Sequence, residues 1–287
     1  MVTSDKKIIE SILELVPDLS FSFENERCVS LDFTSDKCLF YGLLRNHPFQ
    51  REVLSLVGKL NLRYLNLRKC RLRSLPNFGH MDLEHVDLGS NYLGEVPEWL
   101  KGKDLTYLNL GVNLLVEAPC WLQDMHELEV LKLHKNKMLR MPNLSHIQCI
   151  RFLNLYLNSL KQIPSWVWEL RNMEVFSWGV SAVKEIPESI SNWSKLVWLT
   201  FVANKLERLP DAFSTLDCLI GARLHKNRLK ELPEGLSRMK SLRQLTLYQN
   251  KLSCLPSDFP NIHFEKLNLD QNNFAEKPNV VSDWLSY

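Results

Sequence analysis

The sequence lacks long runs of apolar residues. No run of 18 apolar residues occurs among its 287 residues, whereas a membrane-spanning helix needs about 20. Glu10 and Glu14 interrupt the apolar part of the N-terminus, so we expect no signal peptide. With 35 Lys and Arg against 33 Asp and Glu, the net charge is only +2, which does not favour nucleic acid as a partner. We expect a cytoplasmic chain with no membrane span.

Motifs for catalysis and for metal binding are lacking as well. The sequence contains no glycine-rich phosphate loop, no HExxH pair and no nucleophile elbow. We therefore expect a protein that is not an enzyme, with no catalytic residues, no metal site and no cofactor.

What the sequence does contain is a repeat. Leu242–Pro256 reads LRQLTLYQNKLSCLP, and the same phase of Leu, Asn and Pro returns 23 residues earlier from Leu219 and again from Leu196. Ten of the 13 prolines occupy the position of Pro256 in their own repeat. The repeats begin at Leu62, Leu83, Leu105, Leu128, Ile150, Met173, Leu196, Leu219, Leu242 and Phe264. A fixed period of this length predicts stacked repeats, each too small to bury its apolar face alone.

The pattern LxxLxLxxNxLxxLP resembles the leucine-rich repeat family, in the 23-residue intracellular form of Ras-associated scaffold proteins. The resemblance extends from Leu62 to the C-terminus. It implies an α/β fold: a right-handed leucine-rich-repeat solenoid, curved like a horseshoe, with a parallel concave β-sheet and a helical N-terminal cap. It also implies an adaptor or scaffold function. Similar repeats occur in effectors that intracellular bacteria deliver into host cells, and the sequence does not separate the two origins.

Each residue type in the motif has a physical reason. The last two leucines of LxxLxL are two residues apart, so they point to one face of a short strand. The ninth position is Asn in eight of the ten repeats. An Asn side chain both donates and accepts hydrogen bonds, so we expect it to satisfy backbone groups where the chain leaves the strand. The Leu-Pro pair then turns the chain.

We expect two regions: an N-terminal cap over residues 1–61, and ten repeats with a minimal C-terminal cap over residues 62–287. Helical spacing of apolar residues predicts a helix over residues 8–16, ended by Pro17, and Pro48 is expected to open a second helix through about Lys59. Between them lies a degenerate repeat that begins at Cys28. The C-terminal cap would consist of Val280, Val281, Trp284 and Leu285.

The seven cysteines show no extracellular spacing pattern. Cys28 and Cys38 could pair, but they also fit two apolar positions of the degenerate repeat, where Cys acts as a small buried hydrophobe. We favour buried thiols over a disulfide, which indicates a reducing compartment.

Residues that point away from the leucine core are not required by the fold, so their identities are informative. At the third, seventh and eighth positions of the middle repeats they are aromatic or apolar, with basic clusters within and beyond them. Such surfaces are typical of protein interfaces. The predicted partner-binding residues are Tyr64, His85, Tyr107, Val130, Lys132, His134, Lys135, Phe152, Tyr156, Leu157, Val175, Trp198, Val202, Arg223, His225 and Lys226.

Alternatives to this interpretation stay open. The same side chains could simply shield one another across neighbouring strands. Gly89 and Gly111 could form the floor of a hollow that holds a small ligand or a substrate. Trp99, Trp121 and Trp166 follow proline turns and are expected to fill space on the convex side. Trp178, in the irregular sixth repeat, could belong to the core or to a functional place.

The sequence thus predicts a monomer that acts as a non-enzymatic adaptor or scaffold and binds a protein partner on its concave face. One alternative is a secreted bacterial effector that uses the same face on a host protein. Another is an enzyme or small-ligand receptor with a pocket near the second and third repeats.

Overall fold

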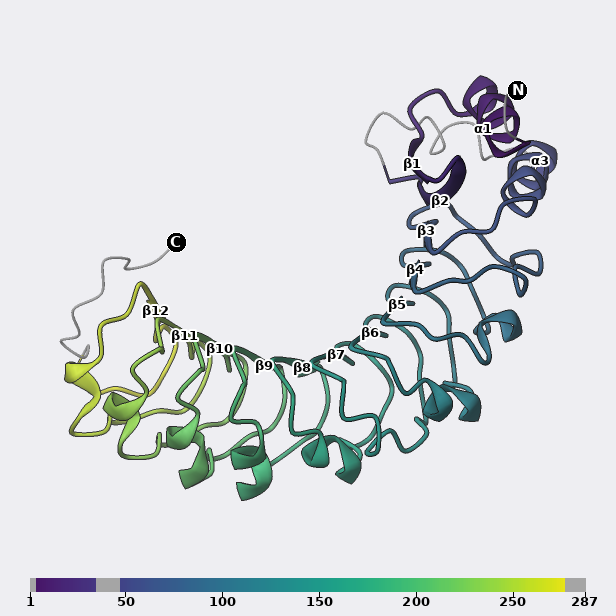
Figure 1. Cartoon of the computed structure of the whole chain (residues 1–287). Coiled ribbons are helices and arrows are strands. Elements are labelled where there is room, and N and C mark those ends of the chain that lie inside the picture. Colours follow the sequence, from purple (N-terminus) through teal and green to yellow (C-terminus); the bar gives the residue numbers. More distant parts are fainter. Residues whose placement is uncertain (1–3, 35–46, 277–287) are drawn as a thin grey trace. The chain divides into compact units, whose positions relative to one another are not determined.

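The computed structural model describes residues 4–34 and 47–276 (Figure 1). The chain forms two compact units, Met1–Pro142 and Asn143–Tyr287, which we call unit 1 and unit 2. In each unit short strands follow one another in chain order along one side, and one-turn 3-10 helices lie on the other side (Figure 1). This is the predicted leucine-rich-repeat solenoid. The predicted division at residue 61 between cap and repeats stays a prediction.

Within its described residues, unit 1 contains the N-terminal helices and six strands. Its elements are α1 (Ser4–Leu15), β1 (Ser20–Glu24), β2 (Arg27–Asp32), α3 (His47–Val57), β3 (Tyr64–Asn66), β4 (His85–Asp87), η1 (Glu98–Leu100), β5 (Tyr107–Asn109), η2 (Cys120–Asp124) and β6 (Val130–Lys132). From β2 to β6 every neighbouring pair is parallel and in register, so residues at the same repeat position lie side by side.

The described part of unit 2, up to residue 276, repeats this arrangement with six more strands. Its elements are β7 (Phe152–Asn154), η3 (Ser165–Glu169), β8 (Val175–Gly179), η4 (Glu188–Asn192), β9 (Trp198–Val202), η5 (Asp211–Thr215), β10 (Gly221–Arg223), η6 (Leu236–Arg238), β11 (Gln244–Thr246), η7 (Phe259–Asn261) and β12 (Lys266–Asn268). All neighbouring pairs are parallel. The parallel sheet expected from the repeat is therefore present in both units.

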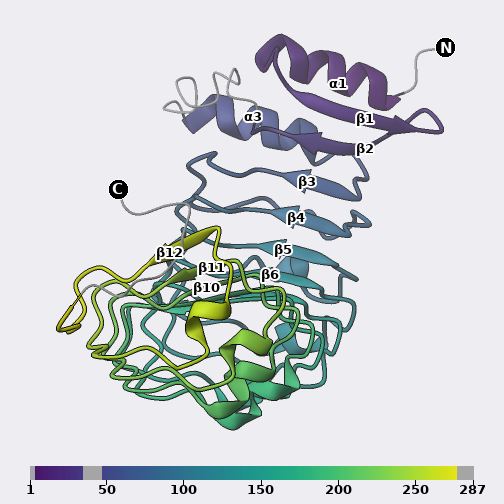
Figure 2. The ribbon, with the colours of Figure 1, turned by 90° about the vertical axis from the view of Figure 1, so that its left-hand side faces the viewer.

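The N-terminal cap confirms the predicted helices and adds a hairpin. Helices α1 and α3 pack against each other at the end of unit 1 that begins with β1 and β2 (Figure 2). Strand β2 is the predicted degenerate repeat, but β1 pairs with it in antiparallel fashion, so the sheet is not parallel throughout. The turn explains this correction: Asn25 and Glu26 have φ of 47° and 66°, and two-residue hairpin turns favour positive φ at both central residues.

The predicted Asn ladder is present and links neighbouring repeats in both units. In unit 2, the Nδ2 of Asn227 donates to the carbonyls of Phe201 (2.7 Å) and Leu224 (2.9 Å), and its Oδ1 accepts from the N–H of Leu206 (3.1 Å). In unit 1, Asn113 donates to the carbonyls of Leu88 and Leu110 in the same way. These amides satisfy buried backbone groups that no strand partner reaches.

A backbone feature that the sequence did not reveal precedes each ladder position. The eighth residue of all ten repeats lies in the left-handed region, with φ between 53° and 61°, although none of the ten is glycine. They are Lys69, Ser90, Val112, Lys135, Leu157, Val180, Ala203, Lys226, Gln249 and Gln271. This conformation costs an L-residue roughly 1–2 kcal/mol, and β-branched Val is among the least suited to it.

The tryptophans of the 3-10 side fill space, as expected. In unit 2, Trp166, Trp168 and Trp193 are buried, and the rings of Trp168 and Trp193 stack with centroids 4.8 Å apart. In unit 1, the buried Trp121 donates from Nε1 to Glu98 (3.1 Å). Trp178 is only 2% exposed and therefore belongs to the core, which answers the question left open by the sequence.

The cysteines that the structure describes match the expectation of thiols in part. Cys28 is a free, fully buried thiol whose pKa is raised to about 11, chiefly by burial. Cys38 lies outside the described residues. Four further free thiols are exposed rather than buried, at Cys120, Cys149, Cys218 and Cys254. Among the described residues, no helix is long and apolar enough to cross a membrane.

Candidate functional site

The candidate site is the strand face, by which we mean the side chains of the strands and of the turns after them that point away from the leucine core. In unit 1 its centre is a column of three stacked rings. The rings of Tyr64 and His85 have centroids 4.3 Å apart, and those of His85 and Tyr107 lie 3.9 Å apart with an interplanar angle of 5°. Lys132 closes the column, because its Nζ lies 4.9 Å from the Tyr107 ring centroid and donates to its hydroxyl at 3.1 Å.

A buried carboxylate, that of Asp87, contacts this column through the Tyr107 hydroxyl. Asp87, only 5% exposed, accepts two hydrogen bonds of 3.0 Å from the Nδ2 of Asn109 and one of 2.8 Å from the N–H of Gly89. The Tyr107 hydroxyl donates to it at 3.5 Å. Burial, and then the charge of Asp87, raise the pKa of Tyr107 to about 12, so this hydroxyl stays protonated at neutral pH. Asp87 thus acts as a structural anchor within the face.

The predicted hollow above Gly89 and Gly111 is filled by the protein itself. A Cβ atom on Gly111 would lie 2.2 Å from Cε1 of His134, so the imidazole ring covers this glycine. A Cβ on Gly89 would lie 2.8 Å from the Asn109 amide nitrogen. The glycines therefore make room for neighbouring side chains and not for a ligand, so the expectation of a hollow above these two glycines is wrong.

The basic cluster in unit 1 carries less charge than its composition suggests. Burial is the main reason that the pKa of His134 lies below its ordinary value, and the neighbouring Lys135 and Lys132 lower it further. The pKa of His85 is also lowered, again mainly by burial. Both rings are therefore neutral near pH 7. Val130 lies half-buried beside Tyr107 in the sheet, and Lys135 is exposed.

Unit 2 presents the broader apolar part of the strand face. Phe152, Val175 and Trp198 are direct neighbours on β7, β8 and β9, and each is half-buried. Trp198 lies against the next strand, since a Cβ on Gly221 would be 2.0 Å from its Cζ3. The three side chains thus form one continuous surface across adjacent strands, as predicted.

Four further residues, at the seventh and eighth repeat positions, extend this surface unevenly. The ring of Tyr156 covers Gly179, where a Cβ would be 2.5 Å from its Cε2. Val202, which pairs with Gly179, is only 7% exposed, so the expectation that it offers contact area is wrong. Leu157 is half-buried and Val180 is 46% exposed, both in the left-handed turn. We name the set Phe152, Tyr156, Leu157, Val175, Val180 and Trp198 the unit-2 patch.

On the strand face of unit 2, uncharged repeats are followed directly by a basic repeat. None of the outward residues at the third, fifth, seventh and eighth positions of repeats five to seven is charged. In the next repeat these positions contain Arg223, His225 and Lys226. The ring of His225 stacks on Tyr248 at 4.2 Å, and its pKa is lowered by burial and then by Lys226 and Arg223. An uncharged apolar surface therefore borders two cations.

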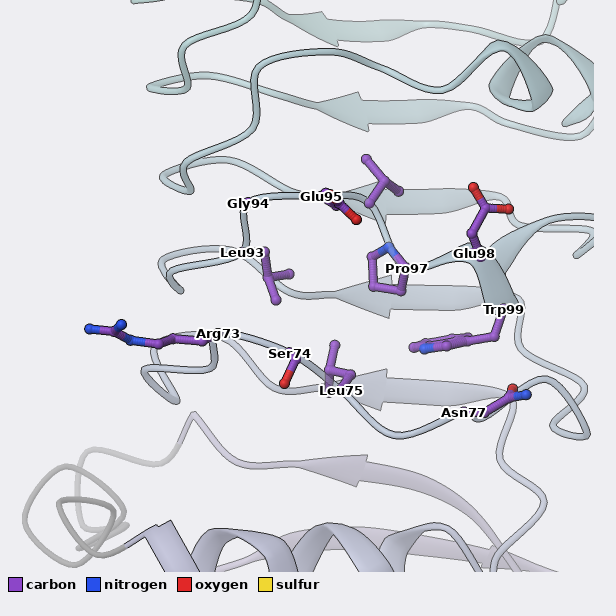
Figure 3. Close-up of a pocket in the computed structure, with 11 residues that line it drawn as sticks. Arg73, Ser74, Leu75, Asn77, Leu93, Gly94, Glu95, Pro97, Glu98 and Trp99 are labelled. Atoms are coloured by element: carbon purple, nitrogen blue, oxygen red, sulfur yellow. The ribbon is translucent and has the colours of Figure 1, made fainter.

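Two features of the surface lie outside the predicted partner-binding residues. One is Val180, which belongs to the apolar eighth positions noted in the sequence and is 46% exposed in the left-handed turn. The other is a cavity of about 650 Å³ in unit 1, lined by residues that follow the strands, among them Arg73, Leu75, Gly94 and Trp99 (Figure 3). The cavity lies where the first repeat, which is only 21 residues long, meets the second.

Within residues 4–34 and 47–276, no group of three or more His, Cys, Asp or Glu side chains is arranged to hold a metal ion.

Comparisons with known proteins agree with this geometry. The family model described as Leucine Rich Repeat matches residues 61–81, the first predicted repeat. A solved leucine-rich repeat protein of Leptospira interrogans has a TM-score of 0.66 to this chain at 26% identity. The chain is a leucine-rich repeat protein. The match covers 76% of this leucine-rich repeat protein and 63% of the Leptospira chain.

Two further structures resemble this leucine-rich repeat protein. YopM, a leucine-rich effector protein of Yersinia pestis, has a TM-score of 0.63 and 26% identity, over 80% of this chain and 58% of YopM. The ectodomain of the Arabidopsis thaliana receptor kinase GASSHO1/SCHENGEN3, solved with CASPARIAN STRIP INTEGRITY FACTOR 2, has a TM-score of 0.58 and 24% identity. The match covers 77% of this chain and 26% of the receptor chain, and the likeness concerns the fold alone. Comparison with curated proteins gave no match.

Proposed function

We propose that this leucine-rich repeat protein is a non-catalytic adaptor or scaffold, and that the unit-2 patch binds a protein partner. The observation that carries the proposal is the run of Phe152, Val175 and Trp198 on three adjacent strands, half-exposed and without a charge among them. Strand stacking requires only the inward leucines, so nothing in the fold demands aromatic residues here. Aromatic side chains at the centre of a surface are the usual anchors of protein interfaces.

The opposing interpretation, mutual shielding, accounts for part of the face. His134, Tyr156 and Trp198 each cover a glycine of the neighbouring strand, which protects backbone from water. Shielding does not account for Val180, which is 46% exposed in a strained turn where Asn or Gly would fit better. An exposed apolar residue at a strained position favours a binding role.

The proposed setting is a reducing compartment, either the cytoplasm or, for an effector, a host cell. Six cysteines lie among the described residues, and the four exposed ones are free thiols, which supports the reducing setting. The likeness to YopM, an effector, and to a Leptospira protein supports a bacterial origin. We propose that the protein acts as a monomer.

Affinity capture with matched variants tests the proposed function. Wild-type chain, Trp198→Ala and Phe152→Ala are immobilised and exposed to lysates of bacterial and eukaryotic cells. Gln244→Ala is the control, because Gln244 occupies the same repeat position two strands from Trp198. We expect a captured protein that is lost with both aromatic variants and kept with the control. A partner retained equally by all four proteins would show that the patch is not the binding site.

A further inference from the structure

A second apolar surface lies in unit 1, outside the strand face, on the segments that follow the strands. Tyr92, Leu114, Val116 and Leu139 are 49%, 42%, 42% and 56% exposed, although all are large and apolar. They occupy the tenth and twelfth positions of the second, third and fourth repeats. We call these four residues the apolar edge.

The four residues are neighbours in space. The N–H of Leu139 donates to the carbonyl of Val116 at 2.9 Å, and the N–H of Leu114 donates to the carbonyl of Leu93, the residue after Tyr92, at 2.9 Å. Between them the chain alternates strictly, with buried Asn113 and Leu115 on either side of exposed Leu114. The outward side chains therefore form one surface. The N–H groups of Tyr92, Leu114 and Leu139 are already bonded to the preceding repeat, so side chains form most of the surface offered to a partner.

Cations border the apolar edge on both sides. At the eighth, tenth and twelfth positions of repeats one to four, the twelve residues include five cations and no anion. Lys69, Arg71 and Arg73 belong to the first repeat, and Lys135 and Lys137 to the fourth. All five are exposed. The nearest acids stand one position further out, at Glu95 and Glu117, and Glu117 already pairs with Arg140 at 3.6 Å.

The same positions in unit 2 show that the fold does not require this pattern. There the tenth position is Ser159, Ala182, Lys205, Arg228, Lys251 or Asn273, and the twelfth is Lys161, Lys184, Glu207, Lys230, Ser253 or Ala275. None is a large apolar residue. The apolar edge is thus a local property of repeats two to four. Contiguous exposed apolar surface rimmed by polar residues marks an interaction site.

We propose that the apolar edge and its basic borders bind an acidic segment of a partner protein, with apolar residues at its centre and carboxylates at both ends. The two borders are three repeats apart, roughly 14 Å at the spacing of neighbouring strands. An extended segment covers this distance with about four to five residues. Apolar side chains of the segment cover Leu114, Val116 and Leu139, while its acidic ends meet Arg71 and Lys137.

The cavity beside the edge extends the same surface. Gly94 occupies the twelfth position of the second repeat and also lines the cavity, together with Arg73. The indole Nε1 of Trp99, another lining residue, is buried without a hydrogen-bond partner. A carbonyl or carboxylate of the bound segment is the group that would satisfy this donor.

Gly94 offers a matched pair of variants that test the charge without disturbing the fold. A Cβ on Gly94 meets no atom within 4 Å, and its φ is not in the left-handed region. Gly94→Glu and Gly94→Lys therefore add side chains of similar length and opposite charge at the edge. Phage-displayed random 12-residue peptides are selected on the full chain, synthesised, and measured by fluorescence anisotropy against both variants, Leu139→Glu and Trp198→Ala.

We expect the selected peptides to contain an apolar centre flanked by Asp or Glu. Leu139→Glu should weaken them at least about tenfold, and Gly94→Glu should bind several-fold more weakly than Gly94→Lys. Trp198→Ala should leave them unchanged, which separates this proposal from the proposed function.

Several outcomes would overturn the proposal. Peptides without acidic residues, equal binding to Gly94→Glu and Gly94→Lys, or no enrichment over a Leu139→Glu column would each do so. Binding of phosphatidylserine vesicles that is lost in Leu139→Glu, without peptide binding, would assign the edge to a membrane surface. Self-association in sedimentation equilibrium that is lost in the same variant would assign it to a second copy.

Discussion

The side-chain oxygen of Asn227 accepts a hydrogen bond of 3.1 Å from the backbone N–H of Leu206 in the preceding repeat. The equivalent oxygen of Asn204 is buried and has no hydrogen-bond partner. Asn204 donates only one bond, at 3.3 Å to Val202. Asn204 belongs to the seventh repeat, so its partners would come from the sixth. The sixth repeat is irregular, with Ser181 in place of the ladder Asn, and this accounts for the difference.

This contrast predicts unequal costs for the same substitution. Asn227→Ala removes three well-formed bonds to buried backbone groups and should lower the free energy of unfolding by about 2–3 kcal/mol. Asn204→Ala removes one long bond and an unsatisfied oxygen, so it should cost less than about 1 kcal/mol. Urea denaturation of both variants measures the difference. Equal midpoints would show that the ladder does not discriminate between regular and irregular repeats.

The repeat, its phase and the inward leucines could be predicted because they follow from a period that any window of the sequence displays. The β1–β2 hairpin could not, because it depends on a turn at Asn25 and Glu26 that lies outside the repeat. The left-handed turn was also hidden. Its residues include Lys, Val, Gln and Ala, and the strain is borne because the interactions between repeats fix the backbone there.

Replacing three glycines by Ala should lower stability to different degrees, according to the space around each one. A Cβ on Gly179 would lie 2.5 Å from the backbone carbonyl of Val202, which cannot move away. On Gly111 it would meet the end of the His134 side chain, which can rotate, and on Gly94 it would meet nothing within 4 Å. Gly179→Ala should therefore cost about 3 kcal/mol, Gly111→Ala about 1, and Gly94→Ala nothing measurable.

Urea melts of these three variants check the series. For Gly111, the double variant with His134→Ala should recover part of the loss. If Gly94→Ala destabilised the chain as much as Gly179→Ala, the close packing around Gly179 would not be the cause of its cost.

The half-buried histidines His134 and His225 predict a dependence of stability on pH. The folded-state pKa values of His134 and His225 lie below their ordinary value of 6.5, chiefly because of burial. Between the folded and unfolded pKa values the unfolded chain binds more protons, so these groups make stability fall as pH decreases below about 6.5. His134→Gln and His225→Gln should each flatten the change in urea midpoint between pH 7.5 and 5.5. An unchanged slope in both variants would contradict the burial of the rings.

The site could be predicted only in part, for a physical reason. The register of strands fixes which residues are neighbours, so the run of Phe152, Val175 and Trp198 followed from counting. Exposure depends on which way a side chain leans, and the glycines decide that. Trp198 leans onto Gly221 and Tyr156 onto Gly179, whereas Val180 stays open. The apolar edge escaped notice because only the structure shows how far its side chains are exposed.

Strain at Val180 predicts a trade between stability and binding. Its φ is 57°, a region that Asn tolerates and a β-branched side chain does not. Val180→Asn should raise the free energy of unfolding by about 1 kcal/mol and weaken partner binding. Lys226→Asn, at the same φ region but without β-branching, is the control and should gain less. A destabilised Val180→Asn, measured by urea denaturation, would show that packing and not strain dominates there.

The unit-2 patch predicts opposite effects for aromatic residues on the two sides of the repeats. Phe152→Ala and Trp198→Ala should each weaken partner binding at least about tenfold, because truncating a central aromatic anchor typically costs about 2 kcal/mol. Trp198→Ala should also cost about 1 kcal/mol of stability, since its ring covers Gly221. Trp121 is 9% exposed on the 3-10 side of unit 1, so Trp121→Ala should lose about 3 kcal/mol of stability and keep its affinity. Titration calorimetry with the captured partner, beside urea melts, measures both quantities. Normal binding by both strand-face variants, together with lost binding by a folded Trp121→Ala, would place the partner on the 3-10 side.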